Sequence, residues 1–141
     1  MRTGAMLVTL ALVAGGLVAC GGNDDKETAA AQGACPAAPA ALATAPKLPA
    51  GFPKPQGVTY TSDKADGPSE VVGGYFDGDI DKAFDAWKGS FGGGTGFDVT
   101  KSEHEAVDAE VNFAGAGSTG QVKLLQQCKD RTTVTVTVRP Q

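Results

Sequence analysis

Two segments in the second half of the chain alternate strictly between apolar and polar residues, and this pattern constrains the fold more than any other feature. Valines alternate with threonines over residues 133–138, and apolar residues alternate with Asp, Glu and Asn over residues 107–113. Successive side chains of a strand point to opposite faces of a sheet, so a period of two predicts strands with one face in the core and the other in water. Shorter apolar segments predict three further strands at residues 58–61, 70–76 and 97–100.

One more element, residues 121–127, fits either a strand or a helix because its Leu-Leu-Gln-Gln run suits both. As a strand, it would be joined to the last strand by a hairpin turn at residues 128–131. The polar run at residues 62–68, which includes a glycine and a proline, predicts the turn between the first two strands. Gly73 and Gly74 weaken the second strand and predict a bulge or the close approach of a neighbour.

One helix is predicted to follow residue 78. Asp79 is placed to cap its first turn, Asp81 favours the positive end of the helix dipole, and Gly89 is expected to end the helix. Four apolar residues recur at the spacing of one helix face: Ile80, Ala83, Phe84 and Trp87. Together these elements predict an α+β fold, in which one helix packs on one face of an antiparallel sheet of about five to six strands.

The segment before the predicted sheet is poor in large apolar side chains. Residues 20–45 contain mostly Ala, Gly, Pro and charged residues, with Leu42 as the single large apolar residue. This composition cannot form a core, so we expect a disordered tether there and a single small α+β domain at residues 46–141. The prolines at the start of the domain predict a polyproline II segment that packs along the domain edge, with Leu48 and Phe52 as its apolar contacts.

The first nineteen residues have the layout of a secretory signal. Arg2 supplies a positive charge, and residues 5–18 form an uncharged, apolar run that ends in small residues. A run of this length is too short to span a bilayer, which requires about 20 apolar residues in a helix. The chain is therefore expected to be exported.

The end of this run carries a more specific motif. Leu17, Val18 and Ala19 lead directly into Cys20, and this segment resembles the lipobox of bacterial lipoproteins, which the type II signal peptidase cleaves. The resemblance implies that residues 1–19 are a lipoprotein signal peptide. It also implies that Cys20 receives a diacylglycerol, with palmitate-like chains, before cleavage ahead of it. An ordinary secretory signal that is cleaved elsewhere is the alternative.

The same resemblance implies a location. A doubly acylated cysteine binds a membrane durably, whereas one acyl chain gives only reversible binding. The mature chain is therefore expected on the extracytoplasmic face of the cell membrane, lipid-anchored and similar to small uncharacterised envelope lipoproteins. Neither Gly21 nor Gly22 is the aspartate that retains such proteins at the inner membrane of double-membraned bacteria, so the final leaflet is left open.

With Cys20 acylated, Cys35 and Cys128 are the remaining cysteines. Export into an oxidising compartment predicts a disulfide between them. The alternatives are two free thiols or a shared metal. A metal site is not expected, because His104 is the single histidine and no CxxC spacing occurs.

Three short motifs resemble ligand-binding or catalytic patterns, and each has a simpler explanation. Residues 115–120 spell G-x-G-x-x-G, but too few residues follow for the helix and parallel strand of a dinucleotide site. Residues 77–81 carry alternate aspartates like a calcium loop, but Lys82 and Lys88 replace its glycine and glutamate, which leaves helix capping. The Glu-His-Glu run at residues 103–105 has acid–base character, yet in a strand the flanking carboxylates point away from the imidazole.

No catalytic residue and no cofactor are expected. Without Arg2, eleven of the twelve basic residues remain against 16 acidic ones, so nucleic acid is not an expected partner. The leading hypothesis is a non-catalytic binding or interaction domain, presented at the membrane to an envelope protein, a wall polymer or a small ligand. The alternative is a carrier of lipid or of a small apolar ligand, with an apolar cavity between sheet and helix. A hydrolase that uses His104 is a third class.

Overall fold

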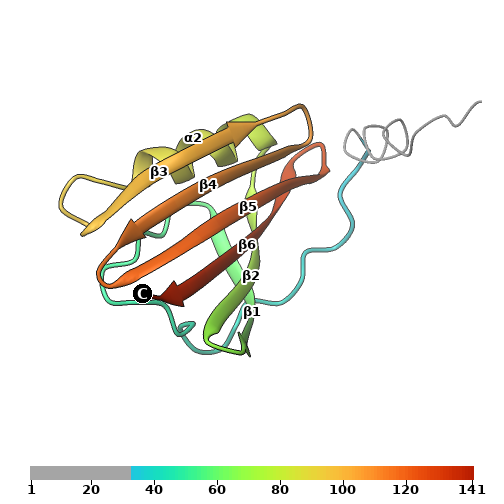
Figure 1. Cartoon of the computed structure of the whole chain (residues 1–141). Coiled ribbons are helices and arrows are strands. Elements are labelled where there is room, and N and C mark those ends of the chain that lie inside the picture. Colours follow the sequence, from blue (N-terminus) through green and yellow to red (C-terminus); the bar gives the residue numbers. More distant parts are fainter. Residues whose placement is uncertain (1–32) are drawn as a thin grey trace, which may run out of the picture.

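The computed structural model describes residues 33–141, which contain six strands and one helix (Figure 1). In chain order they are β1 (Val58–Asp66), β2 (Ser69–Asp77), α2 (Ile80–Ser90), β3 (Phe97–His104), β4 (Asp108–Gly115), β5 (Ser118–Cys128) and β6 (Arg131–Pro140). The predicted signal peptide, with Leu17, Val18 and Ala19, the acceptor Cys20 and the tether up to residue 32 lie outside the described residues. Within residues 33–141, no helix is long and apolar enough to cross a membrane.

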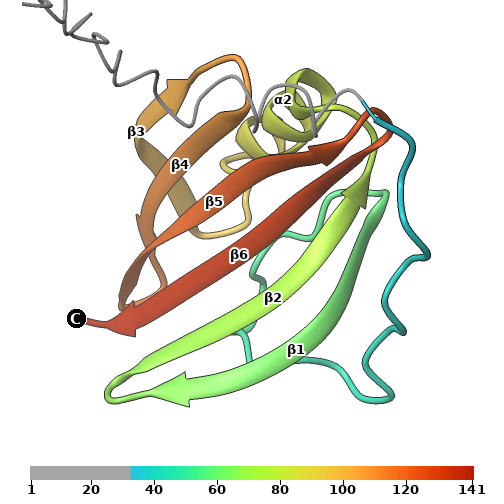
Figure 2. The same ribbon diagram turned by 90° about the vertical axis from the view of Figure 1, so that its right-hand side faces the viewer.

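All neighbouring strands are antiparallel, and their order across the sheet is β1-β2-β6-β5-β4-β3. β6 therefore lies in the middle, between β2 and β5, and α2 carries the chain from β2 to β3 at the far edge. Figure 2 shows the twisted sheet with α2 against one face. The predicted antiparallel sheet with one helix is confirmed, and the ambiguous residues 121–127 belong to strand β5.

The turn between the first two strands is shorter than the sequence predicts. The predicted turn at residues 62–68 is wrong in extent, because β1 continues to Asp66 and pairs with β2 along that length. The turn is Gly67-Pro68, and Gly67 has a φ of +57°, the positive value that the first position of a type II′ turn requires. Proline fixes φ near −65° at the second position, which this turn type accepts. Polar residues remain in a strand here because the backbone pairing does not depend on buried side chains.

The two glycines of β2 lie where β1 approaches it most closely. The register between the two strands shifts between Tyr60 and Ser62, which marks a bulge in β1. A Cβ atom at Gly74 would lie 3.0 Å from the Cα of Tyr60, and one at Gly73 would lie 2.5 Å from the hydroxyl oxygen of Ser62. The predicted close approach of a neighbour is confirmed, whereas the bulge lies opposite the glycines, in β1, and not in β2.

Asp79 caps α2 as predicted. Its carboxylate accepts hydrogen bonds from the ammonium of Lys82 at 2.8 Å and from the backbone N–H of Lys82 at 3.0 Å. Both interactions lower the pKa of Asp79, and the hydrogen bond from the Lys82 ammonium has the larger effect. The helix ends at Ser90, one residue beyond the predicted end at Gly89. Of the four predicted core residues, three are buried and Phe84 is half-buried.

An aromatic cluster fills the space between α2 and the sheet. Its members are Phe52, Trp87, Phe91, Phe97 and Phe113. The ring of Phe52 lies 5.1 Å from that of Phe113 and 6.3 Å from that of Trp87, measured between centroids.

Leu48 and Phe52 pack against the core as predicted. The expectation that the Pro-rich segment follows the domain edge holds at Lys47, whose backbone N–H donates a hydrogen bond to Asp63 of the edge strand β1, but is wrong for the part that carries Phe52. That part crosses the face that carries α2, because Phe52 buries more apolar surface there than at an edge.

Candidate binding site

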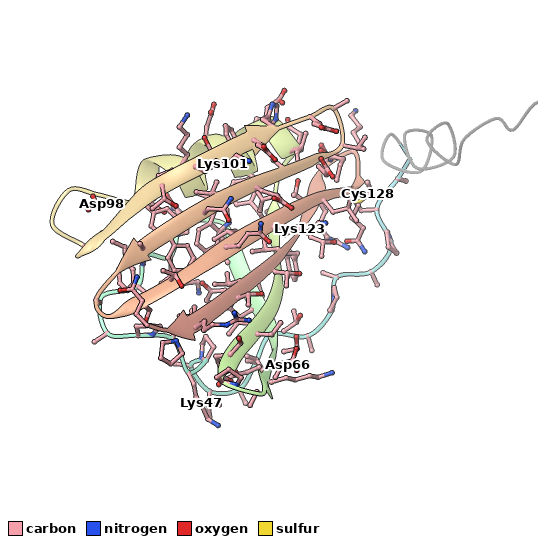
Figure 3. The ribbon with its side chains drawn as sticks, in the orientation of Figure 1. Lys47, Asp66, Asp98, Lys101, Lys123 and Cys128 are labelled. Carbon is pink, nitrogen blue, oxygen red and sulfur yellow. A yellow bond between two sulfur atoms is a disulfide. The ribbon has the colours of Figure 1, made fainter. Side chains whose placement is uncertain are left out.

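The start of the described chain is fixed to the end of β5. The predicted disulfide between Cys35 and Cys128 is confirmed, with the two Cα atoms 5.1 Å apart, and Figure 3 shows Cys128 at that end of the sheet. Next to it, the backbone N–H of Lys129 donates a hydrogen bond to the carbonyl of Gly33 at 3.0 Å. Residues 33–35, which belong to the predicted tether, are therefore held against the domain.

Arg131 reinforces this attachment from the start of β6. Its side chain is largely buried, and Nη1 donates a hydrogen bond to the carbonyl of Pro36 at 2.8 Å. The guanidinium carbon lies 5.2 Å from the centroid of the Tyr75 ring, a cation–π contact. Sequence reasoning places Arg131 only in the hairpin turn, so it misses this contact with a residue 95 positions away.

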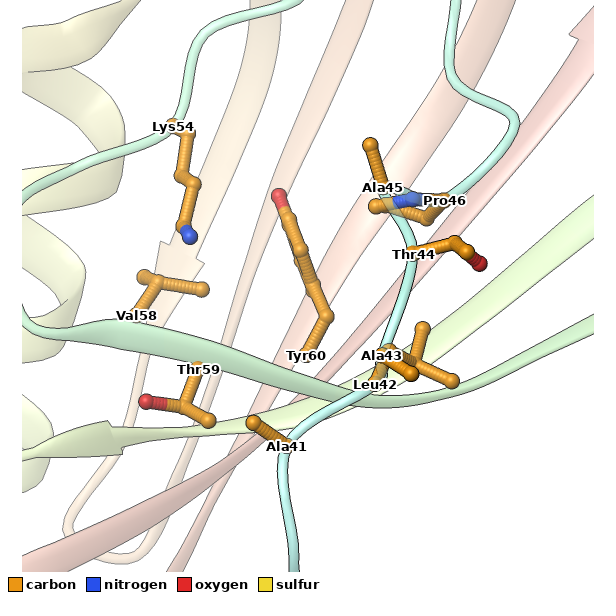
Figure 4. Close-up of a pocket in the computed structure, with 10 residues that line it drawn as sticks. All are labelled: Ala41, Leu42, Ala43, Thr44, Ala45, Pro46, Lys54, Val58, Thr59 and Tyr60. Atoms are coloured by element: carbon orange, nitrogen blue, oxygen red, sulfur yellow. The ribbon is translucent and has the colours of Figure 1, made fainter.

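Further along the chain, residues 41–46 run beside β1 and leave a hollow between the two segments (Figure 4). The backbone N–H of Leu42 donates a hydrogen bond to the carbonyl of Tyr60 at 2.8 Å, and the Leu42 side chain packs against the core. The hollow has a volume of about 390 Å³, and its walls are apolar apart from Lys54, Tyr60 and two threonines. Six of the residues that line it are Leu42, Ala45, Pro46, Lys54, Val58 and Tyr60.

Tyr60 gives this hollow its chemical character. The residue is 6% exposed, and its hydroxyl has no hydrogen-bond partner among the described residues. Burial raises the pKa of Tyr60, so the hydroxyl stays neutral and keeps a proton to donate. The ammonium of Lys54, an exposed residue, lies 5.2 Å from the centroid of the Tyr60 ring. The hollow therefore combines one buried donor, one cation and two threonines with walls that are otherwise apolar.

The unpartnered hydroxyl has a measurable effect on stability. Tyr60→Phe is expected to raise the free energy of unfolding by about 1 kcal/mol, because it removes a buried polar group without a partner and keeps the ring. Urea unfolding, followed by the fluorescence of the single tryptophan, Trp87, measures this change. Tyr75→Phe on the half-buried face is the matched control and is expected to shift the value by less than about 0.5 kcal/mol. A loss of stability in Tyr60→Phe would contradict the assignment.

His104 lies at the end of β3 and contacts α2 rather than its flanking glutamates. Its Nε2 atom lies 3.1 Å from Oδ1 of Asp81, and its ring centroid lies 4.8 Å from that of Phe84. Glu103 instead pairs with Lys101 at 2.6 Å and raises the pKa of Lys101. His104 therefore links β3 to α2, and neither of these contacts supplies the serine or cysteine that the hydrolase hypothesis requires.

The other motifs have structural roles. The G-x-G-x-x-G pattern at residues 115–120 forms the hairpin between β4 and β5, so a strand follows the glycines where a dinucleotide site has a helix. The alternate aspartates at residues 77–81 span the end of β2 and the start of α2, where Asp79 caps the helix.

Sequence reasoning missed the hollow and the roles of Tyr60 and Lys54 in it. Val58 and Tyr60 share one face of the first predicted strand, which is a signal that Tyr60 is buried. Its lack of a partner depends on what packs above it, and no local pattern records that. Lys54 lies between Pro53 and Pro55, both buried, so this lysine is held near the domain surface.

Comparisons with known proteins assign neither a family nor a function to this chain. No family model matches the chain, and no curated protein or solved structure matches it. The interpretation of the hollow and of the fastened N-terminal segment therefore depends on the residues described above.

Proposed function

We propose that the protein is a membrane-anchored, extracytoplasmic lipoprotein with a non-catalytic binding domain. The observation that carries this proposal is the fastening of Cys35 to Cys128 at the end of the sheet. Fourteen residues lie between Cys20 and Cys35, and even a fully extended chain of that length spans at most about 54 Å. An acylated Cys20 would therefore keep the domain close to the membrane surface.

The hollow beside β1 supports a binding role. It presents a hydroxyl donor and a cation on apolar walls, a combination that recognises a ligand. A volume of about 390 Å³ lies within the range of small-molecule sites, roughly 300 to 1,000 Å³.

The aromatic packing favours this proposal over the carrier alternative. A carrier of lipid or of a small apolar ligand would hold its cargo between the sheet and α2, where Phe52 and Phe113 lie with their ring centroids 5.1 Å apart. The hollow beside β1 and two others, of about 390 and 380 Å³, are open depressions in which no residue of α2 takes part. The domain is therefore better suited to bind at its surface than to enclose a cargo.

Substitution of the acceptor cysteine tests the anchor. Cells that express the full chain are labelled with palmitate and separated into membrane and soluble fractions. We expect the wild-type chain to be labelled and to stay with the membrane in high salt. We expect Cys20→Ser to lose the label, because serine lacks the thiol that would be acylated.

Cys128→Ala is the matched control, because it removes a cysteine but leaves the acceptor in place. It is expected to keep both the label and the membrane location. A Cys20→Ser chain that is still labelled, or a Cys128→Ala chain that is present at the wild-type level but carries no label, would overturn the anchor.

A further inference from the structure

We propose that the hollow between residues 41–46 and β1 binds a small organic carboxylate with an apolar body. The ammonium of Lys54 and the hydroxyl of Tyr60 hold the carboxylate, and the apolar walls hold the body. This inference names a ligand class for the binding domain and rests on the proposed function for its biological meaning.

The first step of the argument is the unpartnered hydroxyl. Buried polar groups in folded proteins almost always have a hydrogen-bond partner, and each exception requires an explanation, such as an ordered water, an ion or a functional role. Tyr60 is 6% exposed, and its hydroxyl has no partner in the described part of the chain. In Figure 4 this hydroxyl points between Lys54 on one side and Ala45 and Pro46 on the other. The hydroxyl oxygen itself has almost no exposed surface, so a side chain beside it must move before an acceptor atom can reach it.

The second step is the sign of the charge. Lys54 supplies the one charged group among the residues that line the hollow, and it lies 5.2 Å from the centroid of the Tyr60 ring. None of the ion pairs described among residues 33–141 involves Lys54. An anion is therefore the ligand that this site favours.

The third step is the small number of polar groups. Apart from the hydroxyls of Thr44 and Thr59, the polar side-chain groups that line the hollow are one ammonium and one phenol hydroxyl, which match the two oxygens of a carboxylate. The single cation does not balance the greater charge of a phosphate. The other walls, formed by residues such as Leu42, Pro46 and Val58, would contact an alkyl or aryl group. The ligand is therefore an acid with a single negative charge and an apolar body.

The two tyrosines of the chain provide a direct measurement. The full chain is produced with tyrosine labelled with ¹³C at the ζ carbon, which bears the hydroxyl, and is measured in the presence of lipid nanodiscs. Tyr60 then reports on the hollow, and Tyr75, which does not line it, is the internal control. Hexanoate is expected to shift the Tyr60 signal in a saturable way and to leave the Tyr75 signal unchanged. Hexanol and hexylammonium, which have the same body, are expected to bind at least about tenfold more weakly.

Two lysine variants test the role of the charge. Lys54→Gln is expected to weaken hexanoate binding at least about tenfold, because a charge-assisted hydrogen bond is lost. Lys64→Gln changes the net charge equally and lies on β1 outside the hollow, so it is expected to bind hexanoate as the wild type does. An unchanged Tyr75 signal in both variants shows that the fold is intact.

A second set of measurements distinguishes two sources of a carboxylate ligand. Hexanoate represents an acid from the water phase, and palmitate added to the nanodisc represents an acid from the membrane; a saturable Tyr60 shift with either one supports the proposal. No shift with both, an equal response to hexanol, or an equal loss in Lys64→Gln would overturn it. Because this measurement does not depend on how the chain reached the membrane, its failure would leave the anchor at Cys20 standing. Loss of the anchor in the labelling experiment would likewise leave the ligand result standing.

Discussion

Replacement of Cys35 and Cys128 together by alanine is expected to lower the free energy of unfolding by about 4 to 5 kcal/mol. The disulfide joins residues that are 93 positions apart, and the chain-entropy model assigns about this much to a loop of that length. A small domain is stable by only about 5 to 15 kcal/mol in total, so the variant is expected to be marginal at 37 °C. Urea unfolding in mild detergent, followed by Trp87 fluorescence, measures the difference.

Reduction of the wild-type chain provides the control for this double variant. The reduced wild type keeps both sulfur atoms, so it separates loss of the cross-link from loss of buried volume at Cys128, which is 1% exposed. It is expected to lose nearly as much stability as the double variant. A loss below about 1 kcal/mol in both would show that the bond does not restrain the unfolded chain.

Phe113→Ala is expected to lower the free energy of unfolding by about 3 to 5 kcal/mol. Phe113 is 1% exposed, and its ring stacks on that of Phe91 and meets the ring of Phe52, with both centroids at 5.1 Å. Removal of the ring therefore leaves a cavity that the antiparallel strand β4 cannot close, and aromatic-to-alanine changes of this kind carry the largest costs in protein cores. The variant is also expected to loosen the Pro-rich segment, which Phe52 fixes to the sheet.

Leu125→Ala is the matched control, since it also removes a large apolar side chain from a central strand. Leu125 points away from the core and is 41% exposed, so its loss is expected to change stability by less than about 1 kcal/mol. The measurement is the same urea titration. Equal losses in the two variants would show that the aromatic cluster does not dominate the core.

Local patterns in the sequence identify most of the elements of this fold. The alternation at residues 133–138 and the helical spacing from Ile80 to Trp87 predict their elements because each pattern reflects one buried face. The polar half of β1, from Ser62 to Asp66, was missed because none of its residues is buried, so no alternating pattern marks it as a strand. The position of β6 between β2 and β5 was not predicted either, because strand order depends on contacts that are distant in the sequence.

The candidate site also has one part that the sequence predicts and one part that it does not. Cys35 and Cys128 could be paired from the sequence, because the resemblance to a lipobox assigns Cys20 to acylation and leaves a single partner for each. The hollow could not be predicted, because it is formed by residues 41–46, by Lys54 and by β1, which come together only in the folded chain. Leu17, Val18, Ala19 and Cys20 remain predictions that the labelling experiment tests.

The central place of β6 also sets the order of events during synthesis. β6 follows every other strand in the sequence, yet it joins β2 to β5. Until residues 131–140 have left the ribosome, the β1–β2 hairpin and the β3–β5 meander have no strand to connect them, and each exposes an unpaired edge. The sheet is therefore completed only after translation of the whole domain, which suits a chain that we propose to be threaded across a membrane before it folds.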